Sequence, residues 1–169
     1  MKELLTLFTT AGLLLFAAAA FPQTTPTFPR VAGHMGLVHP IVTFDGDGSH
    51  TNFDGVYVVG VPTAINIWKS PKLAFSFEAV PYIRTENNVS KMSNFLFHPG
   101  VVTPLGKGFS FIGRAAFETS GRFGLTPIVS KVVKKNAHSN YFVSVPFPVR
   151  FGNDKATSLG IAVQVAVGF

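Results

Sequence analysis

Four charged side chains lie in stretches that alternate between bulky apolar and small residues: Glu78, Arg114, Glu118 and Arg150. In each stretch the charge stands among the small residues, on the side opposite to the apolar face. Charges of balanced sign in a poorly hydrated interior are stable when they pair with one another. The pattern therefore predicts a cluster of ion pairs inside the fold. Two roles are open for this cluster, static pairing in the interior, which is the simpler, or a gate that closes the interior to ions.

Histidine and serine are the other residue types here that could do chemistry, but their spacing does not indicate a site. His34 and His39 are five residues apart, so in a strand they point to opposite sides, and His50, His98 and His138 have no closely spaced partner. The segment Asp45 to Ser49 resembles the start of a calcium loop, yet the glutamate that ends such loops is missing. We therefore predict chance placement of the histidines, no metal or cofactor site, no catalytic residue and no enzymatic activity.

Composition narrows the class of protein further. The chain has 169 residues, which suffices for one domain with an interior, and it has no cysteine to form a disulfide or a thiolate metal site. Only 13% of the residues are charged, and the net charge is +6. The basic residues are scattered apart from Lys131, Lys134 and Lys135, so no nucleic-acid-binding face is expected. Attraction to anionic lipid or to lipopolysaccharide phosphates is the expected use of the charge.

The N-terminal segment predicts export. Residues 1–20 have the form of a signal peptide, with an apolar run from Leu4 that ends in three small alanines. The alternative is an uncleaved anchor, for which this run is at the short limit of a spanning helix. We expect cleavage just before Phe21, a short Pro/Thr-rich periplasmic tail over residues 21–29, and one domain over residues 30–169.

From Arg30 onward no helical period occurs, and short β-rich runs alternate with polar breaks. Each run is long enough to cross a bilayer as a tilted strand. The eight predicted runs are 31–44, 53–67, 72–83, 94–104, 108–118, 123–133, 140–150 and 159–169. The breaks predict long loops on one side, at 45–52, 85–93 and 152–158, and tight turns on the other, at 69–71 and 105–107.

The last run has the clearest two-residue period. Its bulky face consists of Leu159, Ile161, Val163, Val165, Val167 and Phe169, and the opposite face of Gly160, Ala162, Gln164, Ala166 and Gly168. We expect the bulky faces of all runs to contact lipid and the small faces to fill a narrow lumen.

Aromatic residues gather where the runs begin and end, which is typical of membrane interfaces. One predicted girdle, on the loop side, is Phe44, Phe53, Phe95, Phe117, Phe123 and Phe151; the other is Trp68, Phe109, Tyr141 and Phe169. The alternative is the general preference of aromatic residues for strands.

Six prolines oppose this interpretation, because proline cannot donate to a ladder and a closed barrel has no edge strand. They are Pro40, Pro62, Pro81, Pro99, Pro127 and Pro146, and we expect either β-bulges at these positions or other bounds for some of the predicted runs.

The signal peptide, the eight amphipathic runs and the terminal Phe169 together resemble small outer-membrane barrels of Gram-negative bacteria, the class of the outer-membrane protein A and X domains. The resemblance implies an all-β fold, a single eight-stranded antiparallel up-and-down transmembrane β-barrel in the bacterial outer membrane. It implies outer-membrane lipid and lipopolysaccharide as partners. It also implies a C-terminal signal for the barrel-assembly machinery, carried by Ile161, Val163, Val165, Val167 and Phe169.

The expected function is a structural or interaction role in the outer membrane, with a lumen filled by side chains. The first alternative is a passive transporter for a small or apolar solute, which needs a partly hollow or laterally open lumen. The second is a soluble periplasmic ligand-binding barrel, which needs a polar exterior.

Overall fold

A computed structural model of the chain describes residues 27–169, which form eleven strands and no helix. In these residues no helix has the length and apolar character needed to cross a membrane. The predicted signal peptide and residues 21–26 of the predicted tail lie outside the described residues. The strands are β1 Arg30–Asp45, β2 Gly48–Thr51, β3 Val56–Gly60, β4 Thr63–Ser70, β5 Leu73–Glu86, β6 Val89–Gly106, β7 Phe109–Glu118, β8 Phe123–Lys135, β9 Asn140–Pro146, β10 Val149–Phe151 and β11 Ser158–Gly168.

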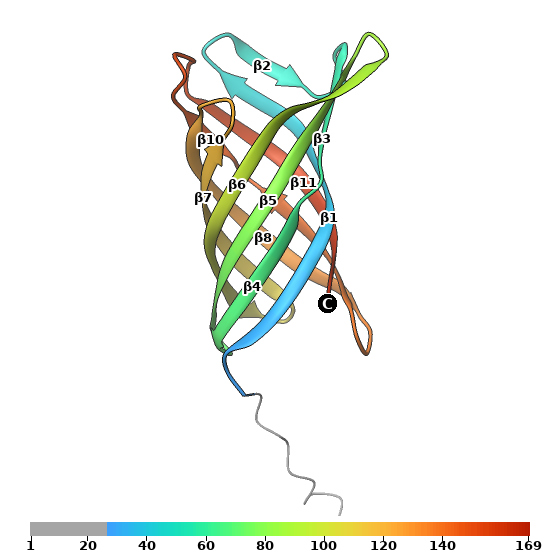
Figure 1. The fold of residues 1–169 in the computed structure, drawn as a ribbon, viewed down its shortest axis with the longest axis vertical. Helices are drawn as coiled ribbons and strands as arrows, with labels where there is room; N and C mark the ends of the chain where they lie inside the picture. Colours follow the sequence, from blue (N-terminus) through green and yellow to red (C-terminus); the bar gives the residue numbers. More distant parts are fainter. Residues whose placement is uncertain (1–26) are drawn as a thin grey trace, which may run out of the picture.

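All pairings are antiparallel, and the pairing of β11 with β1 closes the sheet on itself (Figure 1). Between β1 and β5 lie β3 and β4, one after the other, and between β8 and β11 lie β9 and β10 in the same way. β5 pairs with β6, β6 with β7 and β7 with β8, whereas β2 pairs only with the end of β1. The result is a tilted, barrel-shaped sheet that a meandering chain builds in order.

Two of the predicted runs are each split into two strands, and proline is the reason. The run 53–67 breaks at Val61 and Pro62, and the run 140–150 breaks at Phe147 and Pro148. The two prolines have no N–H to donate. Their carbonyls stay bonded across the gap, since the Gly36 N–H donates to Pro62 at 3.0 Å and the Gly160 N–H donates to Pro148 at 2.8 Å.

The predicted bulges occur at only some of the prolines. The register shifts between Pro40 and Val42, as predicted, and a second shift lies next to Pro81, between Tyr82 and Ile83. Pro99, Pro127 and Pro146 each keep a partner in one neighbouring strand without a shift, so the prediction is wrong there. At Pro99 the ladder towards β7 is instead interrupted, which removes the need for its N–H.

The predicted contrast between long loops and short turns is also only partly right. The predicted loop 85–93 is a two-residue turn at Asn87 and Asn88, with φ of 49° and 60°, and β5 and β6 stay paired up to it. Asparagine tolerates this left-handed backbone, and two such residues in sequence suit the twist of a hairpin. The predicted break 45–52 likewise contains β2, which pairs with the end of β1.

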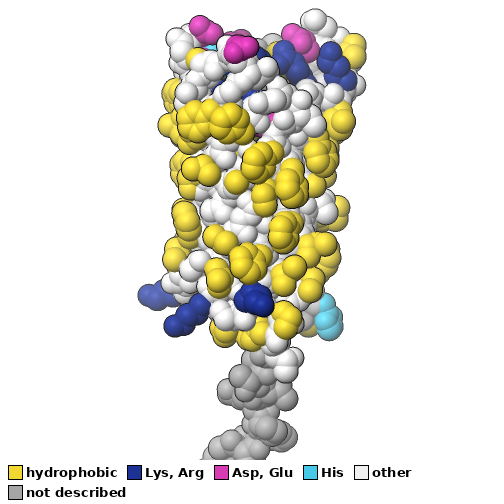
Figure 2. Space-filling model, turned by 60° about the vertical axis from the view of Figure 1, so that its left-hand side comes forward, with side chains coloured by type: hydrophobic (Ala, Val, Ile, Leu, Met, Phe, Trp, Pro, Cys, Tyr) yellow, Lys and Arg dark blue, Asp and Glu magenta, His cyan; other side chains and the backbone are white. Residues whose placement is uncertain are grey.

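The two faces of the wall have opposite character, as the two-residue periods predict. Along β11 the residues Leu159, Ile161, Val163 and Val165 are exposed, and the even-numbered residues between them are buried. Large apolar side chains cover the outer surface between two charged ends (Figure 2). The interior contains a small apolar core in which Val38, Val80 and Leu96 pack with two alanines.

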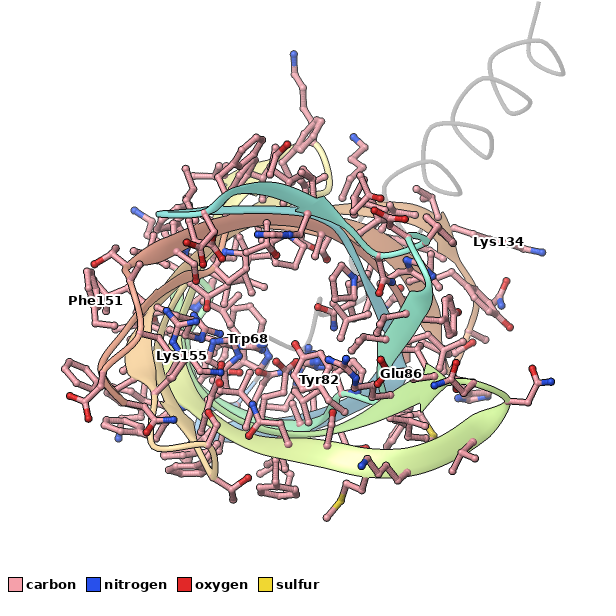
Figure 3. All side chains as sticks on the ribbon, turned by 90° about the horizontal axis from the view of Figure 1, so that it is seen from above. Trp68, Tyr82, Glu86, Lys134, Phe151 and Lys155 are labelled. Atoms are coloured by element: carbon pink, nitrogen blue, oxygen red, sulfur yellow. The ribbon has the colours of Figure 1, made fainter. Side chains whose placement is uncertain are left out.

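The loop-side aromatic girdle lies outside, since Phe44, Phe53, Phe95, Phe117, Phe123 and Phe151 are all exposed. On the turn side Phe109, Tyr141 and Phe169 are exposed as well. Trp68 is not part of this girdle: it points into the lumen and packs beside Ala74, Val102 and Ile112 (Figure 3). The reason is its register, because Trp68 shares the inward face of β4 with the buried Ala64.

Candidate functional site in the lumen

The four charges predicted to cluster all point into the lumen, from β5, β7 and β10. They form two ion pairs. Glu78 pairs with Arg114, and both side chains are at least 97% buried. Arg150 donates from Nε to Glu118 Oε1 at 2.7 Å. The two pairs lie at different levels of the barrel, because Glu78 and Arg114 lie mid-strand whereas Glu118 is the last residue of β7.

Two histidines belong to the same site, so the expectation that histidines are placed by chance is wrong for them. A ring nitrogen of His34 lies 3.1 Å from Glu78 Oε2, and one of His98 lies 3.1 Å from Glu78 Oε1. His34, Glu78 and His98 all stand on the small-residue faces of their strands. Their place on the small-residue face is the sequence signal that they point into the lumen. Their proximity could not be predicted, because it depends on which strands pair in the closed sheet.

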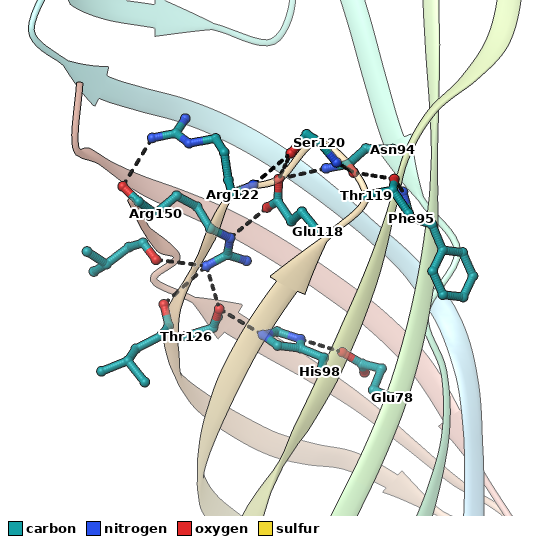
Figure 4. A network of polar contacts seen from close by, with 12 residues as sticks. Glu78, Asn94, Phe95, His98, Glu118, Thr119, Ser120, Arg122, Thr126 and Arg150 are labelled. Carbon is teal, nitrogen blue, oxygen red and sulfur yellow. Dashed lines mark hydrogen bonds and ion pairs between the residues drawn. The ribbon is translucent and has the colours of Figure 1, made fainter. Parts of the chain in front are cut away.

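Thr126 connects the two ion pairs. Its hydroxyl oxygen lies 2.8 Å from His98 Nε2 (Figure 4). The same oxygen accepts a hydrogen bond from Arg150 Nη1 at 3.0 Å. Because His98 also bonds Glu78, one continuous network of polar contacts runs from Arg114 to Glu118. Asn94 extends it towards the loop side by donating to Glu118 Oε2 at 2.7 Å.

The network divides the lumen into two hollow ends, which corrects the prediction of a lumen filled throughout. A cavity of about 570 Å³ lies on the loop side, next to Asn52, Arg84 and Arg122. Another of about 380 Å³ lies on the turn side, bounded by Trp68, Ser130 and Gln164. Between them a cavity of about 50 Å³ lies beside Glu78, His98 and Arg150. Arg114 borders the turn-side cavity, and its Nε has no partner among the described protein groups.

The remaining candidates for metal binding do not converge. Within residues 27–169 no group of three or more histidine, aspartate or glutamate side chains is arranged to hold a metal ion. His39 lies outside the lumen network, 3.1 Å from the Tyr57 hydroxyl, and His50 lies 3.2 Å from Asp45. The backbone N–H of Asp47 donates to the Asp45 carboxylate at 3.0 Å and lowers the pKa of Asp45. This carboxylate thus caps the turn between β1 and β2.

The residues of the predicted C-terminal signal lie on the outer wall. Ile161, Val163, Val165 and Phe169 are exposed, and Val167 is half-buried. They form a continuous apolar ridge on β11, next to β1.

No family model and no curated protein matches the chain. The solved structures it is similar to include one described as "De novo design of transmembrane beta-barrels", with 13% identity, coverage of 86% of this chain and 100% of that chain, and a TM-score of 0.45. Another is the NMR solution structure of the de novo designed TMB2.3, with 9% identity, 84% and 96% coverage, and a TM-score of 0.47.

Proposed function

We propose that this chain is a membrane-spanning barrel of the bacterial outer membrane, with a structural or interaction role and a lumen closed by its polar network. The observation that carries the proposal is the distribution of side chains across the wall. Most of the phenylalanines and many of the valines and isoleucines are exposed on the outer wall, whereas the ion pairs and the buried serines face inward. A soluble barrel would have the reverse arrangement, because a large exposed apolar surface is unfavourable in water.

The backbone supports the same location. In hydrocarbon every N–H and C=O group must be bonded within the protein, and a closed sheet achieves this without an edge. With β3 and β4 counted as one position, β9 and β10 as another, and β2 left out because it pairs only with the end of β1, the ring has eight positions in up-and-down order. β5 has 14 residues and β6 has 18, more than the roughly ten that a tilted strand needs to cross a bilayer.

We further propose that the polar network blocks the passage of ions through the lumen. An ion would have to displace the contacts of Glu78, His98 and Arg114 to pass from one hollow end to the other, and these side chains are nearly fully buried. We therefore propose static pairing, no ion conductance and no enzymatic activity. A soluble ligand carrier is disfavoured by the apolar exterior.

A second candidate is a small passive channel that opens transiently. The cavities favour it, since about 380 Å³ and 570 Å³ are already hollow and only the network separates them. In this case the ion pairs would act as a gate.

The proposed partners are outer-membrane lipid, lipopolysaccharide and the barrel-assembly machinery, which would bind the β11 ridge. Detergent extraction followed by gel migration tests the barrel, because a folded barrel migrates differently before and after boiling. Planar bilayers then test the lumen. We expect no single-channel steps for the unmodified protein. If Arg114→Ala raises the conductance, the gate is favoured; unchanged leakage in that variant rules the gate out.

A further inference from the structure

Charge is distributed very unequally between the two ends of the barrel. Among residues 27–169 the turn-side end carries six lysines, at 69, 72, 107, 131, 134 and 135, and Arg30 at the start of β1. The acidic residues of this range are elsewhere: Glu78 and Glu118 in the lumen, and Asp45, Asp47, Asp54, Glu86 and Asp154 on the loop side. The face drawn in Figure 2 has basic groups at its lower end and acidic groups only at its upper end.

A bulge brings one of these lysines onto the outer wall. The register between β8 and β9 shifts between Val132 and Lys134, and Lys134 stands opposite the exposed Tyr141. Val132 borders the lumen, so the extra residue lets Val133 and Lys134 both face outward. Lys134 accordingly extends away from the barrel (Figure 3).

Directly beside Lys134 the outer wall is hollowed into an apolar groove of about 590 Å³. The groove extends over β1, β11 and β9, and its sides include Leu37, Val143 and Val165. Val133 and Tyr141, the two residues next to Lys134, belong to it as well. The groove thus joins an apolar trough to an exposed cation that has no ion-pair partner among the described residues.

We propose that this groove and the turn-side lysines bind an anionic phospholipid, with an acyl chain in the groove and the phosphate at Lys134 and Lys135. The inference rests on the proposed membrane location. It adds that the bound lipid has an anionic headgroup, that it lies at the turn-side end of the barrel, and that Lys134 and Lys135 bind it. Charge complementarity selects the occupant. An anionic headgroup gains from the lysines, whereas a zwitterionic headgroup has no net charge to offer them. Lys131 is held differently, since its Nζ lies 4.0 Å from the centre of the Phe109 ring.

Native mass spectrometry of the folded protein in detergent tests this, with equal amounts of phosphatidylglycerol and phosphatidylcholine present. Each lysine near an anionic surface contributes a factor of about five in binding. For Lys134 and Lys135 together we therefore expect phosphatidylglycerol to be retained over phosphatidylcholine by about 25-fold, and less as salt is raised. The double variant Lys134→Gln with Lys135→Gln should lose most of this preference. The matched control, Lys91→Gln with Lys155→Gln, removes two exposed lysines from the loop side and should keep it.

Glycerol 3-phosphate in excess should not displace the lipid, because it lacks the acyl chain that the groove holds. Equal retention of the two lipids by the unmodified protein would overturn the inference, as would an equal loss in both double variants. Displacement by glycerol 3-phosphate would show a phosphate site without a lipid site. If the proposed membrane location is itself wrong, the folded chain stays in solution without detergent and retains neither lipid, which is a different result.

Discussion

Gly33 and Phe169 close the barrel at its seam. The Gly33 N–H donates to the Phe169 carbonyl at 2.8 Å, and the Phe169 N–H donates to the Gly33 carbonyl at 3.0 Å. The Phe169 ring covers Gly33 so closely that a Cβ there would lie 2.7 Å from the ring. Phe169 therefore extends the ladder between β1 and β11 by one further pair beyond His34 and Gly168.

This seam allows two possible roles of Phe169 to be separated. Deleting Phe169 removes both hydrogen bonds, and we expect a loss of about 1–3 kcal/mol in the free energy of unfolding. Phe169→Ala keeps the backbone bonds and should lose less. Urea titration of the refolded protein in detergent measures both values. If the ring also serves as the assembly signal, Phe169→Ala lowers the amount of folded protein in cells although it refolds in vitro; normal assembly of this variant would exclude that role.

For the buried pair of Glu78 and Arg114, removing one charge should destabilise the protein more than removing both charges. Glu78→Met leaves the Arg114 guanidinium without its carboxylate and should cost about 3–5 kcal/mol in the free energy of unfolding. The double variant Glu78→Met with Arg114→Met removes both charges and should be clearly more stable than the single variant. The midpoint of urea unfolding reports the difference. A double variant that is no more stable than the single one would contradict the pairing.

Thr126 should be important through its hydroxyl alone. Thr126→Val keeps the shape and removes the partner of His98 Nε2 and of Arg150, so we expect a loss of about 1–3 kcal/mol in unfolding free energy. Thr63→Val, on the exposed face of β4, is the matched control and should be within about 0.5 kcal/mol of the unmodified protein. Equal stability of the two variants would mean that the bridge contributes nothing.

The strands and their faces could be predicted from the sequence because a two-residue period is local. Alternation in β11 alone assigned Val163 outward and Gln164 inward, as found. The network could only be predicted in part. Glu78 and Arg114 are 36 positions apart, and His34 reaches Glu78 only because β4 lies between β1 and β5 in a closed ring. The effect of a proline on the ladder also depends on whether a neighbouring strand has a carbonyl that would accept a hydrogen bond from that position. The sequence of a single strand does not contain this information.

The tight turn at Asn87 and Asn88 stands where a longer loop over 85–93 was predicted. Both residues have positive φ, so Asn88→Val should strain the turn and loosen the paired ends of β5 and β6. Asn88→Gly should leave them intact. Hydrogen exchange at Glu86 and Val89 measures the effect, and equal protection in the two variants would count against a tight turn.

The central claim is that the outer face of the strands meets hydrocarbon. The chain has no cysteine, so a single introduced cysteine carries a unique spin label. Neighbouring positions on β11 make the comparison: Val165 is 50% exposed on the outer wall, and Gln164 is buried beside the lumen. In lipid vesicles we predict that a label at Val165 collides with dissolved oxygen far more often than with a water-soluble nickel chelate, and that a label at Gln164 lacks this preference. A Val165 label that collides freely with the nickel chelate would contradict the account.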